Sequence, residues 1–441
     1  MLLLLVIAAV AAAATPTSSS PAIHHHPRQL VHPPWDMPVR RHGHVCTDAS
    51  PDHAPQQENN TRMSFWALPD GPPPPSGFPV YVELKAEIFS AGDWRHPSET
   101  PQCGNGWVPP PDGWWRPKFN TFDTPAQAMA SCFRKDGSWE PLGWHAGANC
   151  SFFQKAGQLW VARLHQYLLA NGIAILVVNP YAGDTWEWDD PALPAGTGLD
   201  QPFFSALFGS IQNGTYGSLP AGSLNTGQLF FSGFSDGAQM TSWLIELQAR
   251  QQLPAGVKLA AGVLISGGSH RCYFSPPDAV SNCAACTDTQ GDCGGGSGSR
   301  GCSLTAEPLC CSYCCPANYT EDFYSAHPAA YATHPPCFLA QSGHSDFNAD
   351  LCAAKVYYET LQAHGVMSEL VLLPKADAQC ACVGGPEALS AEGRASPLAR
   401  ECPLKPPEPS GDRGNCVDHV SGFAAMVVPL TEFMLKVLAT I

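Results

Sequence analysis

One stretch decides the fold: Gly227-Gln228-Leu229-Phe230-Phe231-Ser232-Gly233-Phe234-Ser235-Asp236-Gly237. Its first six residues form a short, largely apolar run, which is typical of a buried strand. The residues that follow, 238–250, place apolar side chains at helical spacing. A G-x-S-x-G pentapeptide between a strand and a helix predicts a tight, strained turn that lifts the hydroxyl of Ser235 clear of the sheet edge.

The two glycines of the pentapeptide have a steric role. A Cβ atom at Gly233 or Gly237 is expected to collide with the neighbouring strand and helix. The helix that begins behind Ser235 brings free N–H groups and a positive dipole end to the same place. We therefore expect the backbone N–H of Asp236 to stabilise an oxyanion that forms beside Ser235.

A serine nucleophile needs a base, and the base needs an orienting acid. In an open α/β sheet these partners come from loops at the carboxyl ends of strands. Residues 336–341 predict such a strand, and the loop after it carries Asp346, which we take as the acid. Asp350 and Asp377 are the reserves, Asp350 being more simply explained as a helix cap.

The base is expected just before the closing helix, which the apolar pattern predicts over residues 423–439. Asp418-His419-Val420-Ser421-Gly422-Phe423 leads into that helix, so His419 is the candidate. His344, in the loop of Asp346, and His364, at a helix end where a cation is favourable, are the rivals.

The motifs GFSDGAQM, SGHSD and DHVSGF, in the order Ser235, Asp346, His419, resemble the α/β-hydrolase superfamily. The stretch 224–238 is similar to secreted esterases of the polyhydroxybutyrate-depolymerase and feruloyl-esterase type. The resemblance covers residues 60–440 and implies a doubly wound, mostly parallel α/β sheet with a Cys-rich cap insertion. It also implies cleavage of a small-molecule or polymeric carboxylic ester through a Ser-His-Asp triad, without metal or cofactor. The alternative is a catalytically silent fold that acts as a secreted binding protein.

The chain departs from that family at the oxyanion hole. These esterases carry a His-Gly pair after the third strand, and residues 82–89 lack it. The second oxyanion donor is therefore expected within residues 86–89. The 73 residues between Asp346 and His419 are accounted for largely by an insertion at 375–416.

The domain organisation follows from composition and periodicity. Residues 1–14 predict a signal peptide, although the usual positive start is missing. Residues 15–60, rich in Pro, Ser and His, predict a disordered leader. Strands and helices then alternate over 61–441, which predicts one α/β-hydrolase domain, and insertions interrupt this domain at 270–335 and 375–416.

Cysteine usage indicates an oxidising compartment. The chain has 19 cysteines, so at least one is left unpaired within the chain. Nine lie between Cys272 and Cys315 without a histidine among them, which favours disulfides over a zinc site. Four N-glycosylation sequons, beginning at residues 59, 149, 213 and 318, fit secretion.

The net charge, the length of the apolar runs and the tryptophans indicate which kinds of partner the chain can bind. The net charge of −15 excludes binding that depends on a basic surface, such as nucleic-acid binding. No apolar run is long enough for stable membrane insertion. Trp186 and Trp188 are candidates for lining an aromatic or sugar-bearing substrate pocket, with ordinary packing as the alternative.

Overall fold

A computed structural model of the chain describes residues 29–34, 37, 39–48, 61–84, 161, 163–178, 186, 200–267, 324, 327–342, 351–373 and 424–441. The elements, in chain order, are β1 (Arg41–Asp48), β2 (Thr61–Leu68), β3 (Phe78–Leu84), β4 (Ala174–Val178), α3 (Asp200–Gln212), β5 (Leu224–Phe234), α4 (Asp236–Ala249), β6 (Leu259–Ile265), η4 (Pro328–Thr333), β7 (Cys337–Ser342), α6 (Leu351–Ala363), β8 (Ser368–Leu373) and α9 (Ala424–Leu438). Residues 163–170 are also helical and precede β4.

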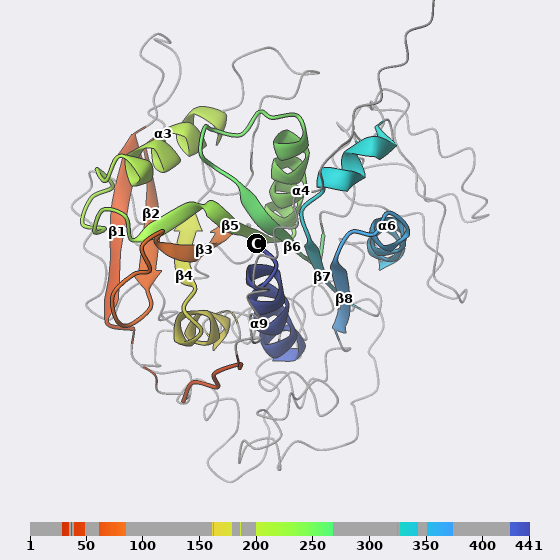
Figure 1. Cartoon of the computed structure of the whole chain (residues 1–441), viewed down its shortest axis with the longest axis horizontal. Helices are drawn as coiled ribbons and strands as arrows, with labels where there is room; N and C mark the ends of the chain where they lie inside the picture. Colours follow the sequence, from red (N-terminus) through yellow and green to blue (C-terminus); the bar gives the residue numbers. More distant parts are fainter. Residues whose placement is uncertain are drawn as a thin grey trace, which may run out of the picture.

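The strands form one eight-stranded sheet in the order β1-β2-β4-β3-β5-β6-β7-β8. The β1–β2 and β2–β4 pairs are antiparallel, and all pairs from β4 to β8 are parallel. This is the mostly parallel sheet of an α/β-hydrolase fold, as the sequence predicted. The elbow strand β5 lies near its centre (Figure 1).

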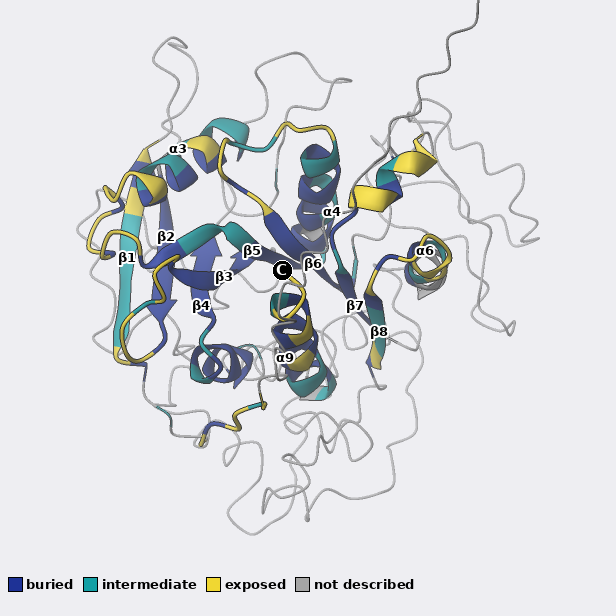
Figure 2. Ribbon diagram, viewed as in Figure 1, coloured by how far each residue is buried: buried dark blue, intermediate teal, exposed yellow. Residues whose placement is uncertain are grey.

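Helices cover both faces of the sheet (Figures 1 and 2). One core packs Tyr81 of β3 against Tyr167 of the helix over residues 163–170 and Phe433 of α9. The other core packs Val82 of β3 against side chains of α3, α4 and α6. Adjacent β3 residues enter opposite cores because side chains alternate along a strand. The predicted doubly wound architecture is confirmed.

The prediction of a disordered leader over residues 15–60 is wrong for residues 41–48, which form β1. This strand pairs along its whole length with β2, from Arg41 opposite Leu68 to Asp48 opposite Thr61. An edge strand leaves most of its side chains half-buried. Its sequence therefore need not show the apolar pattern that marks a buried strand.

Residues 29–34 also belong to the folded domain. The guanidinium of Arg163, which is buried, donates to the carbonyl oxygens of Pro33 at 2.6 Å and Pro34 at 3.0 Å. Asn171 accepts from the N–H of Val31 and donates to its carbonyl oxygen. These backbone contacts fasten the segment to the helix over residues 163–170, independently of its side chains.

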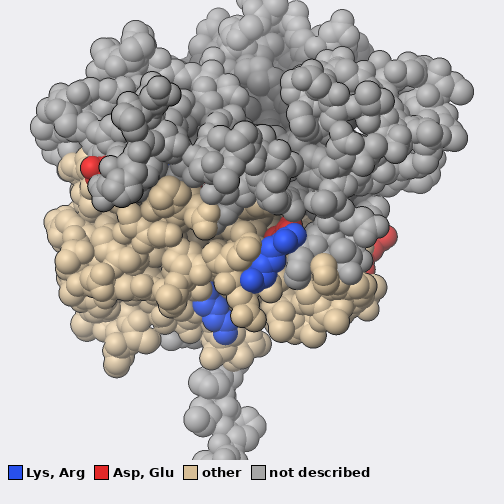
Figure 3. Space-filling view, turned by 90° about the horizontal axis from the view of Figure 1, so that it is seen from above, with Lys and Arg blue, Asp and Glu red and all other residues tan. Residues whose placement is uncertain are grey.

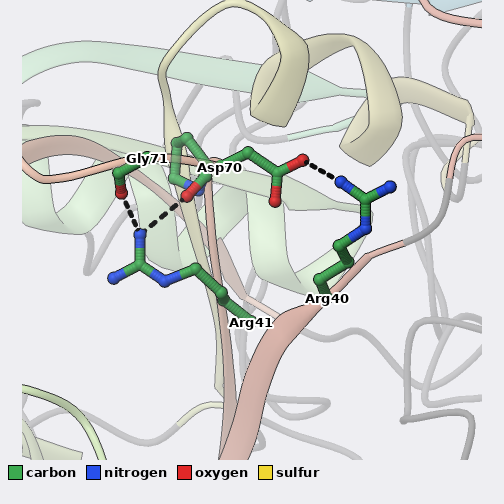
Figure 4. A network of polar contacts seen from close by, with 5 residues as sticks. Arg40, Arg41, Asp70 and Gly71 are labelled. Atoms are coloured by element: carbon green, nitrogen blue, oxygen red, sulfur yellow. Dashed lines mark hydrogen bonds and ion pairs between the residues drawn. The ribbon is translucent and has the colours of Figure 1, made fainter.

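The loop that follows β2 is held by Arg41, the first residue of β1, and by Arg40, the residue before it (Figure 4). Arg41 donates to the carbonyl oxygen of Pro69 at 3.0 Å and also to that of Gly71. Arg40 pairs with Asp70 at 3.0 Å, with both side chains exposed. Exposed pairs of this kind add little stability, so the carbonyl contacts of Arg41 do more to fix the loop.

The predicted insertion over 270–335 ends earlier than expected. Tyr324, Tyr331 and His334 are buried in the core that contains α4 and α6, and the hydroxyl of Tyr324 donates to the carbonyl oxygen of Ile245. Residues 268–323 lie outside the described residues, as does the insertion at 375–416.

The described helices and the described surface each show one further feature. None of the helices in the described part of the chain combines the length and the apolar run that a bilayer span requires. Charged side chains are sparse on the described part of the face shown in Figure 3.

Candidate active site

Ser235 lies on the turn between β5 and α4, at the centre of the sheet's carboxyl edge. Its backbone has φ 52° and ψ −114°, and it occupies the N-cap position of α4. A non-glycine residue with positive φ is uncommon and costs free energy, so it persists only where its surroundings enforce it. The predicted strained elbow is confirmed, and Ser235 is half-buried on it.

The glycines of the elbow are sterically required. A Cβ atom on Gly233 would lie 1.9 Å from the carbonyl carbon of Gly237, and one on Gly237 would lie 2.2 Å from the carbonyl oxygen of Leu84. All of these neighbours are backbone atoms that cannot rotate away. The start of α4 is thus packed against the ends of β5 and β3, as the sequence predicted.

The turn after β6 forms a second wall of the elbow, which the sequence did not reveal. The N–H of Ser235 donates to the carbonyl oxygen of Ile265 at 3.0 Å. Ser266 also has positive φ, at 47°, and a Cβ atom on Gly267 would lie 3.0 Å from the carbonyl oxygen of Ser235. The N–H of Ser266 donates to Ala340 of β7 at 2.8 Å. The ends of β5, β6 and β7 are therefore joined directly beside the nucleophile.

The start of α4 bears on the predicted oxyanion donor, the backbone N–H of Asp236. The N–H groups of Ala238 and Gln239 return to the carbonyl oxygen of Ser235 at 3.0 and 3.2 Å. Asp236 occupies the first position of α4, where a backbone N–H has no carbonyl partner within the helix. Its role in an oxyanion hole stays a prediction, and residues 86–89 lie outside the described residues.

Most of the predicted triad partners lie outside the described residues: Asp346, His419, Asp350, Asp377 and His344. The strand before Asp346 is described. It is β7, which runs parallel to β6 with Ala340 opposite Ile265, and it ends at Ser342 on the same sheet edge as the elbow. The assignment of Asp346 and His419 stays a prediction.

The rival base His364 is described, and it lies at the wrong edge. It follows α6 and stands four residues before β8, which is parallel to β7. Its imidazole stacks on Tyr331 with ring centroids 4.0 Å apart. The amino end of a six-residue strand lies about 20 Å from its carboxyl end. His364 therefore cannot reach Ser235.

Trp186 is half-buried beside α3. It stacks on Phe204 with ring centroids 5.7 Å apart and an interplanar angle of 23°, and Phe204 stacks in turn on Phe208. The indole thus extends an aromatic cluster that reaches Phe231 of β5. This contact accounts for packing of one ring face, and a role in substrate binding stays a prediction. Trp188 lies outside the described residues.

A buried polar cluster lies just upstream of the elbow, and sequence reasoning missed it. The Tyr81 hydroxyl donates to Ser232 Oγ at 2.7 Å, and His165 Nε2 lies 2.5 Å from Glu83 Oε2. Burial, helped by the charge of Glu83, raises the pKa of Tyr81, so the phenol stays a neutral donor. The signal in the sequence was a Tyr and a Glu at alternate positions of an otherwise apolar strand.

The described residues bear on two kinds of chemistry, metal binding and cysteine oxidation. Within the described ranges no three His, Cys, Asp or Glu side chains cluster as metal ligands do. Cys46 is disulfide-bonded, and Cys337 is a buried free thiol. Most of the Cys-rich segment, including Cys272 to Cys315, lies outside the described residues, so its disulfides stay a prediction.

No family model and no curated protein matches the chain. Among solved structures it is similar to an acylaminoacyl peptidase from Pyrococcus horikoshii, with 12% identity and a TM-score of 0.34 over 82% of this chain and 39% of the peptidase. It is also similar to an esterase from Pyrobaculum calidifontis, with 12% identity and a TM-score of 0.34 over 82% and 84% of the two chains. Esterase Est22 is similar with 12% identity and a TM-score of 0.35, over 82% of this chain and 79% of the esterase. The chain thus spans about two fifths of the length of the peptidase, and the fold assignment rests on its own strand order and elbow.

Proposed function

We propose that the protein is a secreted serine hydrolase that cleaves carboxylic esters. The observation that carries the proposal is the backbone of Ser235, held at positive φ by a helix start and two strand ends that leave no room for a side chain at Gly233 or Gly237. Such strain is maintained where a reactive group must be presented.

The proposed reaction uses Ser235, His419 and Asp346. Ser235 Oγ attacks the ester carbonyl carbon while its proton passes to the imidazole of His419. The alcohol leaves with that proton. Water then attacks the acyl-enzyme with His419 again as base, and the acyl–Oγ bond breaks, which releases the carboxylic acid as Ser235 Oγ takes the proton back from His419. Asp346 holds the imidazole in the required tautomer. The N–H of Asp236 and a donor from residues 86–89 bind the oxyanion.

The proposed substrate class is a small-molecule or polymeric ester of the kind cleaved by polyhydroxybutyrate depolymerases or feruloyl esterases. The support is the similarity of residues 224–238 to those enzymes. Trp186 and Trp188 are proposed to contact an aromatic substrate. Export is supported by the apolar start of the chain, the sequons and the disulfide-bonded state of Cys46.

A fluorophosphonate probe tests the assignment of the nucleophile. The wild-type protein should be labelled at Ser235, and Ser235→Ala should lose both labelling and ester hydrolysis. Ser205→Ala is the matched control, because Ser205 is exposed on α3, and it should keep both. Labelling that persists in Ser235→Ala would refute the assignment, and a wild type that neither labels nor hydrolyses would favour the silent binding protein.

An ester panel tests the substrate class. Aromatic hydroxycinnamate esters and hydroxybutyrate oligomers should be cleaved with higher kcat/KM than plain acetyl esters of the same alcohol. Trp186→Ala should raise KM for the aromatic esters more than for the acetyl esters. An equal effect on both series, together with a lower melting temperature, would assign Trp186 to packing alone.

A further inference from the structure

The buried polar cluster upstream of the elbow consists of Tyr81 and Glu83 on β3, Ser232 on β5 and His165 on the helix over residues 163–170. We propose that this cluster is a positioning device, which holds the end of β3 in register with the nucleophile elbow. The inference rests on the proposed function, since it assigns a role to residues that support the reaction of Ser235 without touching the substrate.

The cluster is placed one residue from the elbow contact. In the parallel β3–β5 pair, Glu83 lies opposite Ser232 and Leu84 lies opposite Gly233. The carbonyl oxygen of Leu84 is the atom against which Gly237 packs. A shift of β3 along β5 would therefore move the strand end that meets the first turn of α4.

The side chains of the cluster face away from α4. Tyr81 belongs to the core that contains α9 and the helix over residues 163–170, and Glu83 shares its face because side chains alternate along a strand. The rings of Tyr81 and His165 meet edge to face, with centroids 6.2 Å apart. The helix over residues 163–170 thus contacts β3 through the pair of His165 and Glu83. Tyr81 links β3 to β5 through its hydrogen bond to Ser232.

Burying these polar side chains costs free energy of folding, which favours a role for them beyond packing. The four residues are between 0 and 7% exposed. Burying polar and ionisable groups costs free energy even when they are hydrogen-bonded, and apolar side chains of similar size often serve stability better. Hydrogen bonds, however, are directional, so they fix the register of two strands where apolar side chains allow small slips.

A fixed register of β3 and β5 would keep the reacting groups at the elbow in place. A displacement of about 1 Å at a reacting group can lower the rate about 10²-fold. The end of β3 also precedes residues 86–89, where the second oxyanion donor is proposed. Fixing Leu84 against β5 and α4 therefore fixes the last described residue before that segment.

The test substitutes one partner without changing its shape. In Glu83→Gln, kcat should fall about 10- to 100-fold, equivalent to about 1.4–2.7 kcal/mol, while KM changes less than about twofold, since ground-state binding is untouched. In His165→Gln, kcat should fall by a similar factor. In the double variant, kcat should fall no further than in either single variant. Tyr81→Phe, which removes only a hydroxyl, should fold readily and lower kcat in the same direction.

A second buried ion pair provides the control. Arg62 of β2 pairs with Asp200 of α3, both buried, three strand positions from β5 in the sheet. Asp200→Asn should lower the melting temperature as Glu83→Gln does, but it should leave kcat per folded molecule unchanged. Melting curves measured alongside the kinetics allow each rate to be referred to folded protein.

The outcomes separate this inference from the proposed function. If Glu83→Gln and Tyr81→Phe lose stability but keep kcat, the cluster is structural only and the inference is overturned, while the esterase assignment stands. If the loss appears equally in Asp200→Asn, general destabilisation explains it and the inference is also overturned. If the wild type shows no Ser235-dependent hydrolysis or labelling, the proposed function fails and the inference fails with it.

Discussion

Replacing Gly237 with alanine should disable the elbow, and the structure allows the effect to be estimated. The new Cβ atom would lie 2.2 Å from the carbonyl oxygen of Leu84 and 3.2 Å from its carbonyl carbon. Ordinary contact with a Cβ atom begins at 3.4 Å. Either the end of β3 or the start of α4 must therefore move by about 1 Å, because neither neighbour is a side chain that can rotate away.

Two quantities should change in Gly237→Ala. Overpacking of this size destabilises proteins by about 1–3 kcal/mol, and the better helix propensity of alanine offsets part of that loss. A shift of about 1 Å beside the nucleophile should lower kcat/KM about 10²-fold. The activity loss should therefore exceed what partial unfolding explains.

Gly209→Ala is the matched control. Gly209 lies within α3, and a Cβ atom there would meet nothing within 4 Å. This variant should be stabilised by about 0.5–1 kcal/mol, with activity unchanged. The assays are urea denaturation and kcat/KM on a short-chain ester. A Gly237→Ala enzyme with wild-type stability and activity would refute the steric account of the elbow.

Two further predictions concern buried groups in the core. Burial lowers the pKa of His334 from 6.5 to about 4, so the unfolded chain takes up the proton first and stability is lost as pH falls from about 6.5 towards 4, by about 3 kcal/mol. His334→Gln should show a smaller loss of unfolding free energy over that window, and an identical pH dependence would contradict the prediction. Burial raises the pKa of the free thiol of Cys337 to about 12, so iodoacetamide should modify it only after unfolding. Mass spectrometry of the Cys337 peptide checks this, and rapid alkylation of the native protein would be the contrary result.

The sequence predicted the central elements because their burial leaves a clear pattern. β6 is buried along its whole length and shows an uninterrupted apolar run, and the buried second half of β5 shows the shorter apolar run Leu229-Phe230-Phe231. The glycines of the elbow were also predictable, since a strand-turn-helix connection this tight has no room for Cβ atoms. Only the ends differ: β5 begins at Leu224, three residues before the predicted run.

The sequence could not predict features held by backbone contacts or by partners far along the chain. β1 is held by its ladder with β2, and residues 29–34 by carbonyl contacts with Arg163, neither of which requires apolar side chains. The Glu83–His165 pair joins residues 82 positions apart. A lone Glu in one segment and a lone His in another carry no sign that they meet.

The described edges of the sheet narrow the search for the base. His334 and His364 precede β7 and β8, so both lie at the amino edge, and both are engaged with aromatic side chains of the core. Ser235 lies at the carboxyl edge, about one strand length away. The base must therefore come from a segment that follows a strand rather than one that precedes it. His344 and His419 both meet this requirement by position, and His419 is favoured because His344 is only two residues from Asp346, too close along a loop to stand between that acid and Ser235.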